Sequence, residues 1–152
     1  MRTGIDLLPG FQRPGQRYVT EPGSSEIVRV FVEAQIVGTA TISRAEVVAG
    51  FIRAVRRGAL ASEDAEFARH QFQTEWRHFQ HHQITDSLIG RSCDLPWSFG
   101  LRGYDSVQLA AAVRWQEELD LPLTLATFDE QLWKAAARAG LEPYPPDLLE
   151  IR

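Results

Sequence analysis

Hydrophobic runs of strand length alternate along this chain with longer segments of helical periodicity. The strand-length runs lie at 39–42, 83–85, 121–126 and 142–144. Apolar residues at helical spacing extend over 26–35, 43–57, 62–80, 87–99, 104–119 and 130–139. Because strands that alternate with helices form parallel sheets, we predict an α/β fold: a parallel β-sheet with helices on both faces.

The first 16 residues, MRTGIDLLPGFQRPGQ, depart from this alternation. Glycine and proline interrupt them, and only 5–8 is suitable for a short strand. A proline-rich stretch ends the last predicted strand near residue 145. We therefore divide the chain into an atypical N-terminal segment (1–16), a folded domain (17–145) and a C-terminal tail (146–152).

Composition narrows the class of protein. The lone cysteine, Cys93, excludes a disulfide framework and a cysteine-based zinc site, and it favours a reducing cytoplasm. No apolar run reaches the length of a transmembrane helix, and no signal-peptide pattern opens the chain, so we expect a cytoplasmic protein without a membrane partner. The net charge of −4 does not indicate nucleic-acid binding. Carboxylates around a bound cation would nevertheless make a protein acidic while they suit phosphate chemistry.

Three acidic residues occupy positions where chemistry is expected. Glu46 and Asp129 each follow a predicted strand within a few residues, and Asp105 opens the helix that follows Gly103. Each acid also has a structural explanation: Glu46 in a capping box with Ser43, and the two aspartates as favourable charges at helix N-termini. Ligands of parallel sheets bind beyond the carboxyl ends of the strands, where the three acids would meet. Because clustered carboxylates repel one another unless cations lie between them, we predict an acidic pocket that holds Mg²⁺.

A histidine cluster is the other candidate metal site. His78, His81 and His82 lie together near the end of the predicted helix 62–80. Histidines four residues apart can bind a metal ion, but no carboxylate accompanies these at the spacing of a metal motif. We do not expect a metal there.

At the acidic residues the sequence resembles the PIN-domain ribonucleases, and in particular the VapC-type toxins of type II toxin–antitoxin systems. The resembling segments are RYVTEPGS (17–24), SRAE (43–46), LRGYDSVQLA (101–110) and TFDEQL (127–132). They occur in the order and at the spacing of the family, over about residues 16–145. The resemblance implies that 17–145 is a PIN domain, with Mg²⁺ or Mn²⁺ held by acids and RNA cut by activated water.

The resemblance also assigns residues and partners. Glu46, Asp105 and Asp129 match the catalytic and metal-binding acids of the family, Thr127 matches its small polar position beside the last acid, and Arg102 is expected to support the substrate. A cognate antitoxin whose C-terminal segment lies in a groove near the site is implied, and we expect a homodimer. The aromatic residues Phe72, Trp76 and Phe79 are candidates for the antitoxin surface, with a role in the core as the alternative.

One position departs from the family pattern. The first family acid lies in the opening strand, and counting back from Arg17-Tyr18 puts it at Gly10. Asp6 is the acid nearby, but four residues of strand leave it about 13 Å away. We therefore expect the opening strand to be degraded or missing, with Asp6 as an additional metal ligand only if 7–16 loops out.

Two hypotheses follow from this departure. The chain is a metal-dependent endoribonuclease that acts as a toxin, or it is a catalytically impaired PIN-fold module that binds an antitoxin or RNA without cleaving, because the first acid is absent. Mg²⁺ affinity and RNA cleavage distinguish the two.

A shifted reading frame would explain the N-terminal segment. Residues 7–16 can be encoded by CTT CTA CCT GGA TTC CAG CGC CCT GGT CAG. Read from its second base, this string encodes Phe-Tyr-Leu-Asp-Ser-Ser-Ala-Leu-Val, which has the pattern of the missing strand, and its Asp falls on the codon of Gly10. We interpret 1–16 as a frame-shifted remnant of the first strand, a hypothesis that the gene sequence tests.

Overall fold

A computed structural model describes residues 4–7 and 33–149 of the chain. Its strands are β1 (Gly4–Leu7), β2 (Val37–Ala40), β3 (Gln80–His82), β4 (Leu123–Ala126) and β5 (Glu142–Tyr144). Its helices are α2 (Ser43–Arg56), α3 (Ser62–Trp76), α4 (Asp86–Ser92), α5 (Leu95–Phe99), α6 (Gly103–Leu119) and α7 (Glu130–Arg138). The strands form one sheet in the order β3-β2-β1-β4-β5, and every pairing is parallel, so the predicted α/β class is confirmed.

The strand β1 lies at the centre of the sheet, although the opening strand was expected to be degraded or missing. It pairs with β2 on one side and with β4 on the other, and Asp6 stands beside Gly38 and Leu125. The expectation that the opening strand is missing is therefore wrong, and the strand that is present, 4–7, overlaps the predicted short strand 5–8. Gly10 and the rest of 8–32 lie outside the described residues, so the frame-shift hypothesis stays a prediction.

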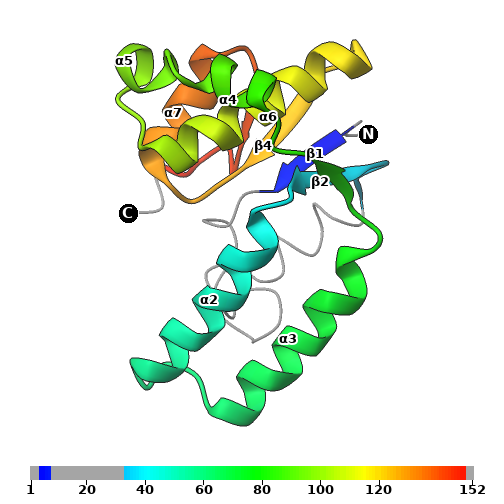
Figure 1. Cartoon of the computed structure of the whole chain (residues 1–152), viewed down its shortest axis with the longest axis vertical. Coiled ribbons are helices and arrows are strands. Elements are labelled where there is room, and N and C mark those ends of the chain that lie inside the picture. The colour runs from blue at the N-terminus through cyan, green and yellow to red at the C-terminus, as the bar shows by residue number, and fades with distance from the viewer. Residues whose placement is uncertain (1–3, 8–32, 150–152) are drawn as a thin grey trace.

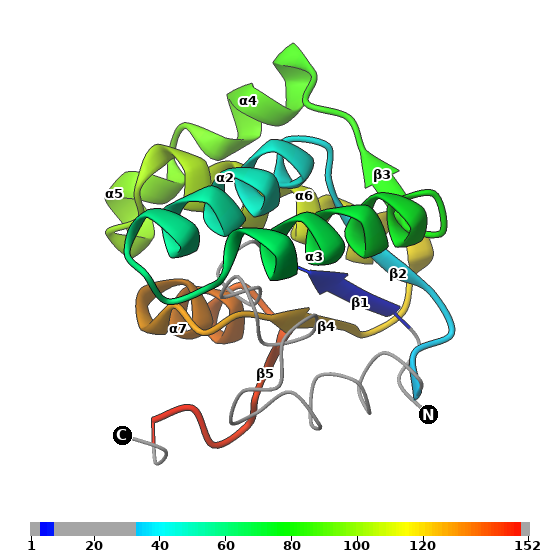
Figure 2. The ribbon, with the colours of Figure 1, turned by 90° about the horizontal axis from the view of Figure 1, so that it is seen from below.

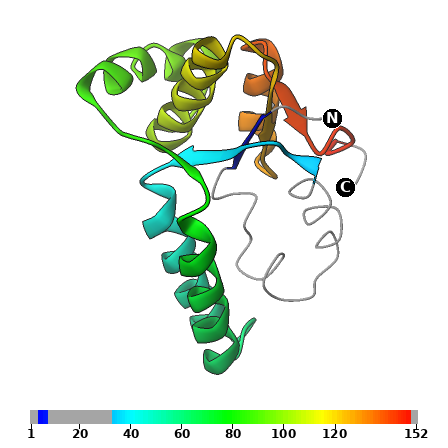
Figure 3. The same cartoon turned by 90° about the vertical axis from the view of Figure 1, so that its right-hand side faces the viewer.

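Helices α6 and α7 cover one face of the sheet, with α4 and α5 on the same side (Figure 1). Figure 3 shows this layer above the strands and the α2–α3 hairpin on the opposite side. The core between β4, α6 and α7 consists of Leu101, Leu109, Ala112, Trp115, Leu123, Leu125, Leu132, Ala135, Ala136 and Leu141. No helix in the described part of the chain could cross a membrane.

The α2–α3 hairpin extends away from the sheet (Figures 1 and 3), and Figure 2 shows its two helices lying side by side. The hairpin has a hydrophobic core of its own. Phe72 and Trp76 are buried in it, with their rings 5.6 Å apart in an edge-to-face contact. Phe79 is partly buried and packs both against this core and against a smaller one around Ala126 and Tyr144. Of the two roles considered for these aromatics, the role in the core is therefore the one that Phe72 and Trp76 have, because their apolar area holds the two antiparallel helices together.

Element boundaries differ from the predictions where turn chemistry competes with strand propensity. The predicted strand 83–85 is wrong: β3 is Gln80–His82, and 83–85 is a loop in which the Thr85 hydroxyl accepts a hydrogen bond from the Leu88 N–H at 3.2 Å and caps α4. The predicted helix 87–99 is two helices, and Pro96 stands in the first turn of the second, α5. Most of the predicted helix 26–35 lies outside the described residues.

Candidate functional site

One arginine holds two of the three predicted acids. The Arg102 Nε donates to Asp105 Oδ2 at 2.9 Å, and the Arg102 Nη2 donates to Asp129 Oδ2 at 3.1 Å. Arg102 immediately precedes α6, Asp105 lies in the first turn of α6, and Asp129 immediately precedes α7. The packing of α6 and α7 against β4 therefore brings two acids from distant parts of the sequence to a single guanidinium.

The two carboxylates interact electrostatically across this arginine. Burial raises the pKa of Asp105, the hydrogen bond from Arg102 opposes that rise, and the nearby charge of Asp129 adds to it. The hydrogen bond to Asp105 in turn raises the pKa of Arg102 above its usual range. The hydrogen bond from Arg102 therefore favours the ionised form of a carboxyl group whose burial and acidic neighbour favour the neutral form.

Asp129 is positioned with both of its oxygens in use. Its Oδ1 accepts the Leu132 N–H at 2.9 Å, which confirms the predicted N-cap of α7. Its own N–H donates to the Thr127 Oγ1 at 3.1 Å, and the backbone N–H of the fully buried Thr127 donates to the Tyr144 carbonyl of β5 at 3.0 Å. These bonds turn Asp129 Oδ2 away from the cap and toward Arg102.

Glu46 lies in the first turn of α2 without the predicted capping box. Ile42 occupies the N-cap position of this helix, and no side chain caps it. The buried Ser43 hydroxyl instead accepts hydrogen bonds from Thr39 Oγ1 at 2.8 Å and from Gln108 Nε2 at 3.0 Å. The capping-box interpretation is therefore wrong, and the half-exposed Glu46 carboxylate has only a long ion pair with Arg53 at 3.9 Å among the contacts described for it.

Tyr104 lies near both Glu46 and Asp105 and is part of a polar network that the sequence analysis missed. Its hydroxyl accepts a hydrogen bond from Gln108 Nε2 at 2.6 Å. Burial raises the pKa of Tyr104 to about 12, against the hydrogen bonds from Ser43 and Gln108, and the charges of Glu46 and Asp105 contribute to the rise. The phenol therefore lies within the electrostatic field of both acids. The sequence signal for this polar network was Gln108, which lies one turn after Tyr104 in a helix that is otherwise rich in alanine.

Asp6 is placed by the backbone alone. It is the third of the four residues of β1 and stands in register with Leu125, four positions before Asp129. Because β1 and β4 are parallel neighbours, Asp6 and the loop that carries Asp129 belong to the same carboxyl edge of the sheet. Connections leave this edge in opposite directions, toward β2 and toward β5, which is where parallel sheets bind ligands.

The oxygen donors at this edge suit a hard cation. Carboxylates are the ligands that Mg²⁺ and Mn²⁺ prefer, and Asp105 and Asp129 already converge on one positive charge. Among the residues that the structure describes, no three histidines, cysteines or acids form a group that could hold a metal ion, so Asp105 and Asp129 come together without Glu46 as a third member. A metal site that includes Glu46 or Asp6 stays a prediction.

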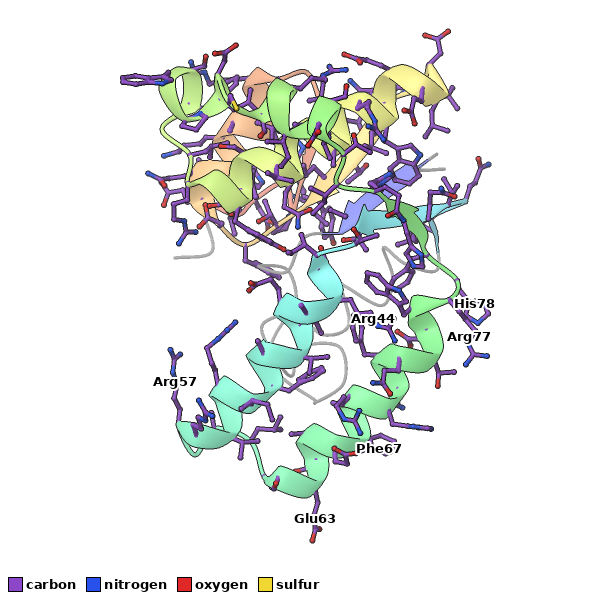
Figure 4. The ribbon with its side chains drawn as sticks, in the orientation of Figure 1. Arg44, Arg57, Glu63, Phe67, Arg77 and His78 are labelled. Carbon is purple, nitrogen blue, oxygen red and sulfur yellow. The ribbon has the colours of Figure 1, made fainter. Side chains whose placement is uncertain are left out.

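The histidine cluster serves the fold. His82 is buried, with its ring centroid 4.6 Å from that of Trp115. His81 stacks on Trp76 at 4.4 Å, and its Nε2 lies 2.8 Å from the Trp76 carbonyl oxygen. Figure 4 shows His78 pointing away from the hairpin. The side chains of His81 and His82 thus pack against different tryptophans, and that of His78 is exposed.

Comparisons with known proteins show the fold. No family model matches this sequence, and no curated protein matches it. The structure is similar to that of PAE2754 from Pyrobaculum aerophilum, with a TM-score of 0.62 and 12% identity over 99% of this chain and 95% of that one. It is also similar to FitAcB from Neisseria gonorrhoeae, with a TM-score of 0.61 and 15% identity over 93% of this chain and 97% of that one. At these identities the likeness shows that the chain shares its fold with both proteins over nearly its whole length.

Proposed function

We propose that this chain is a metal-dependent endoribonuclease of the PIN-domain, VapC type, the toxin of a toxin–antitoxin pair. The observation that carries the proposal is the convergence of Asp105 and Asp129 on one positive charge at the carboxyl edge of the parallel sheet. The two acids lie in segments that resemble the family in order and spacing. The fold shared with PAE2754 and FitAcB over nearly the whole chain supports the same assignment.

The residues of the site have separable tasks. Asp105, Asp129, Glu46 and Asp6 would hold Mg²⁺ or Mn²⁺, which supplies a water nucleophile at neutral pH and neutralises charge that develops on the phosphate. Thr127 and the N-terminus of α7 hold Asp129 in one orientation. The hydrogen bonds from Gln108 to Ser43 and to Tyr104 join α6 to the start of α2, and Arg102 would offer its exposed guanidinium to the substrate.

The partners follow from the same proposal. Single-stranded or structured RNA is the substrate, a cognate antitoxin is the protein partner, and the chain forms a homodimer. An antitoxin surface must lie outside the buried aromatics of the α2–α3 hairpin. The exposed hairpin residues that Figure 4 labels, among them Arg57, Phe67 and Arg77, are available to a protein partner.

The impaired-module alternative rests on the absence of the first family acid, which was expected at Gly10. The position of Asp6 in the central strand β1 supports Asp6 as a substitute for that acid. The active enzyme is therefore the function that we favour.

The test uses the purified chain, a fluorescein-labelled single-stranded RNA, and Mg²⁺ or EDTA. We expect cleavage that requires Mg²⁺, and a loss of at least about 100-fold in Asp105→Asn, because a metal ligand is removed while size and hydrogen bonding are kept. Asp120→Asn is the matched control: Asp120 ends the same helix in the left-handed region (φ 52°), which asparagine tolerates. It should cleave like the parent, and thermal melting followed by circular dichroism should be the same for all three proteins.

Two outcomes would contradict the proposal. Parental cleavage by Asp105→Asn would remove Asp105 from the mechanism. A parent chain that neither binds Mg²⁺ nor cleaves RNA, yet is folded, would restore the impaired-module alternative.

A further inference from the structure

We infer that Arg102 exchanges partners when the site binds a divalent cation: it neutralises Asp105 and Asp129 in the metal-free protein, and after displacement it binds a phosphodiester group of the RNA. This inference rests on the proposed function and deepens it. It makes Arg102 a link between metal binding and substrate binding.

The arginine and a metal ion need the same oxygen atoms. Asp129 Oδ1 is committed to the Leu132 N–H, so Oδ2 is the atom that remains for a cation, and Arg102 Nη2 holds it at 3.1 Å. Asp105 Oδ2 is likewise held by Arg102 Nε at 2.9 Å. A guanidinium and a metal ion cannot both lie between these two oxygens, because their positive charges would repel each other at contact distance. Binding one cation therefore requires the other to leave.

The arginine is able to leave while the acids stay. Its side chain is 73% exposed, compared with 12% for Asp105 and 31% for Asp129. The Arg102 backbone is anchored, because its carbonyl accepts the Ser106 N–H at 2.9 Å and the Ser106 hydroxyl at 3.0 Å. The side chain can thus rotate about a fixed attachment point without disturbing α6.

The displaced guanidinium is well placed for a phosphodiester. It remains beside the N-terminus of α6, a helix of 17 residues whose first N–H groups and dipole favour an anion. Arginine offers planar, paired donors that match phosphate oxygens. A substrate phosphate at the metal would then restore to Arg102 the negative partner that it lost.

This exchange couples the two ligands. The metal releases a phosphate-binding residue, so it strengthens binding of the nucleic acid, and by thermodynamic reciprocity the nucleic acid strengthens binding of the metal by the same factor. Without Arg102 the metal no longer competes with a resident cation, and the coupling through this residue disappears.

The experiment measures binding rather than cleavage. Mn²⁺ affinity is determined by electron paramagnetic resonance with the wild type, Arg102→Ala and Arg91→Ala. The affinity for a fluorescein-labelled 12-nucleotide oligodeoxyuridine, which carries the phosphodiester backbone, is determined by anisotropy with and without saturating Mn²⁺. Arg91 is the matched control, because it forms a two-pronged ion pair with Glu117, at 2.7 and 2.8 Å, outside the site.

We expect Arg102→Ala to bind Mn²⁺ about tenfold more tightly than the wild type, equivalent to about 1.4 kcal/mol. Mn²⁺ should strengthen oligonucleotide binding to the wild type and to Arg91→Ala, but much less to Arg102→Ala. In the unsubstituted protein, the Arg102 Nε–H resonance, assigned with Arg102→Lys, should shift when Mg²⁺ is added. This last measurement does not depend on the folding of an alanine variant.

Unchanged or weaker Mn²⁺ binding by Arg102→Ala, or an Arg102 Nε–H resonance that ignores saturating Mg²⁺, would overturn the exchange. If the wild type and all variants fail to bind Mn²⁺, the proposed nuclease function fails together with the exchange. The two failures are distinguishable, because metal binding persists in the first and is absent in the second.

Discussion

Mild acid should destabilise this fold through one buried histidine. His82 ends β3 beside Ala40 of β2, and its ring packs against Trp115. Only 5% of the residue is exposed. Burial lowers the pKa of His82 from 6.5 to about 4, with smaller contributions from the positive charges of Arg114 and His81. The native state therefore holds a neutral imidazole over most of the accessible pH range.

The direction and size of the change in the free energy of unfolding follow from proton linkage. Between pH 6.5 and pH 4 the unfolded chain binds a proton that the native state excludes, so the free energy of unfolding falls as the pH falls through this window. A pKa difference of about 2.5 corresponds to about 3 kcal/mol for the complete transition. About 2 kcal/mol of this is lost between pH 7 and pH 5, a large share of the stability of a domain of this size.

The assay is urea unfolding at pH 7 and pH 5, followed by tryptophan fluorescence. His82→Gln removes the titrating group, and His78→Gln removes an exposed histidine of the same cluster (Figure 4). Carboxylates titrate alike in all three proteins, so their contribution cancels in the comparison. We expect the wild type and His78→Gln to lose about 2 kcal/mol more than His82→Gln over this interval.

The reasoning would be refuted by a His82→Gln variant that loses as much stability between pH 7 and pH 5 as the wild type. Such a result would mean that the native imidazole accepts a proton as readily as the unfolded one, and that His82 is not held neutral against Trp115.

The remaining predictions concern a cap and a close contact. Asp129→Asn should keep the melting temperature, because asparagine caps a helix as well as aspartate does, yet it should lose RNA cleavage. Asp129→Ala should lower the free energy of unfolding by about 1 kcal/mol, as should the cap control Thr85→Ala; equal stability of Asp129→Ala and the wild type would contradict the cap. Gly38→Ala would place a Cβ 2.7 Å from the Trp115 ring and 2.8 Å from His82 Nε2. This substitution should lower the free energy of unfolding, measured in urea, by about 1–3 kcal/mol. An unchanged free energy of unfolding would mean that the Trp115 ring moves aside freely.

Helices with strong periodicity and clear terminators were predictable from the sequence. The predicted helix 43–57 corresponds to α2 (Ser43–Arg56), and the predicted helix 130–139 corresponds to α7 (Glu130–Arg138). Each is followed by a glycine in the left-handed region, Gly58 with φ 71° and Gly140 with φ 85°. These signals are local, because they depend on side-chain spacing and on backbone freedom within a few residues.

The candidate acids were predictable as positions but not as an arrangement. Asp105 and Asp129 stood out because each follows a break and begins a helix, which is visible in the sequence. Their shared partner Arg102 was expected only to support a substrate. Whether two carboxylates meet depends on how α6 and α7 pack against β4, and that packing is set by long-range contacts such as those of Leu109, Leu125 and Leu132.

The sequence by itself determined the α/β class and the extent of α2 and α7, because periodicity, capping and turn signals act over short distances. Only the tertiary structure decided that 4–7 is the central strand, because a four-residue strand is stabilised by neighbours on both sides rather than by its own pattern. It likewise decided that Ser43 joins a buried polar network instead of a capping box, since Gln108, 65 positions along the chain, competes for its hydroxyl. Interactions between residues far apart in the sequence leave no local signal, so only the tertiary structure reveals them.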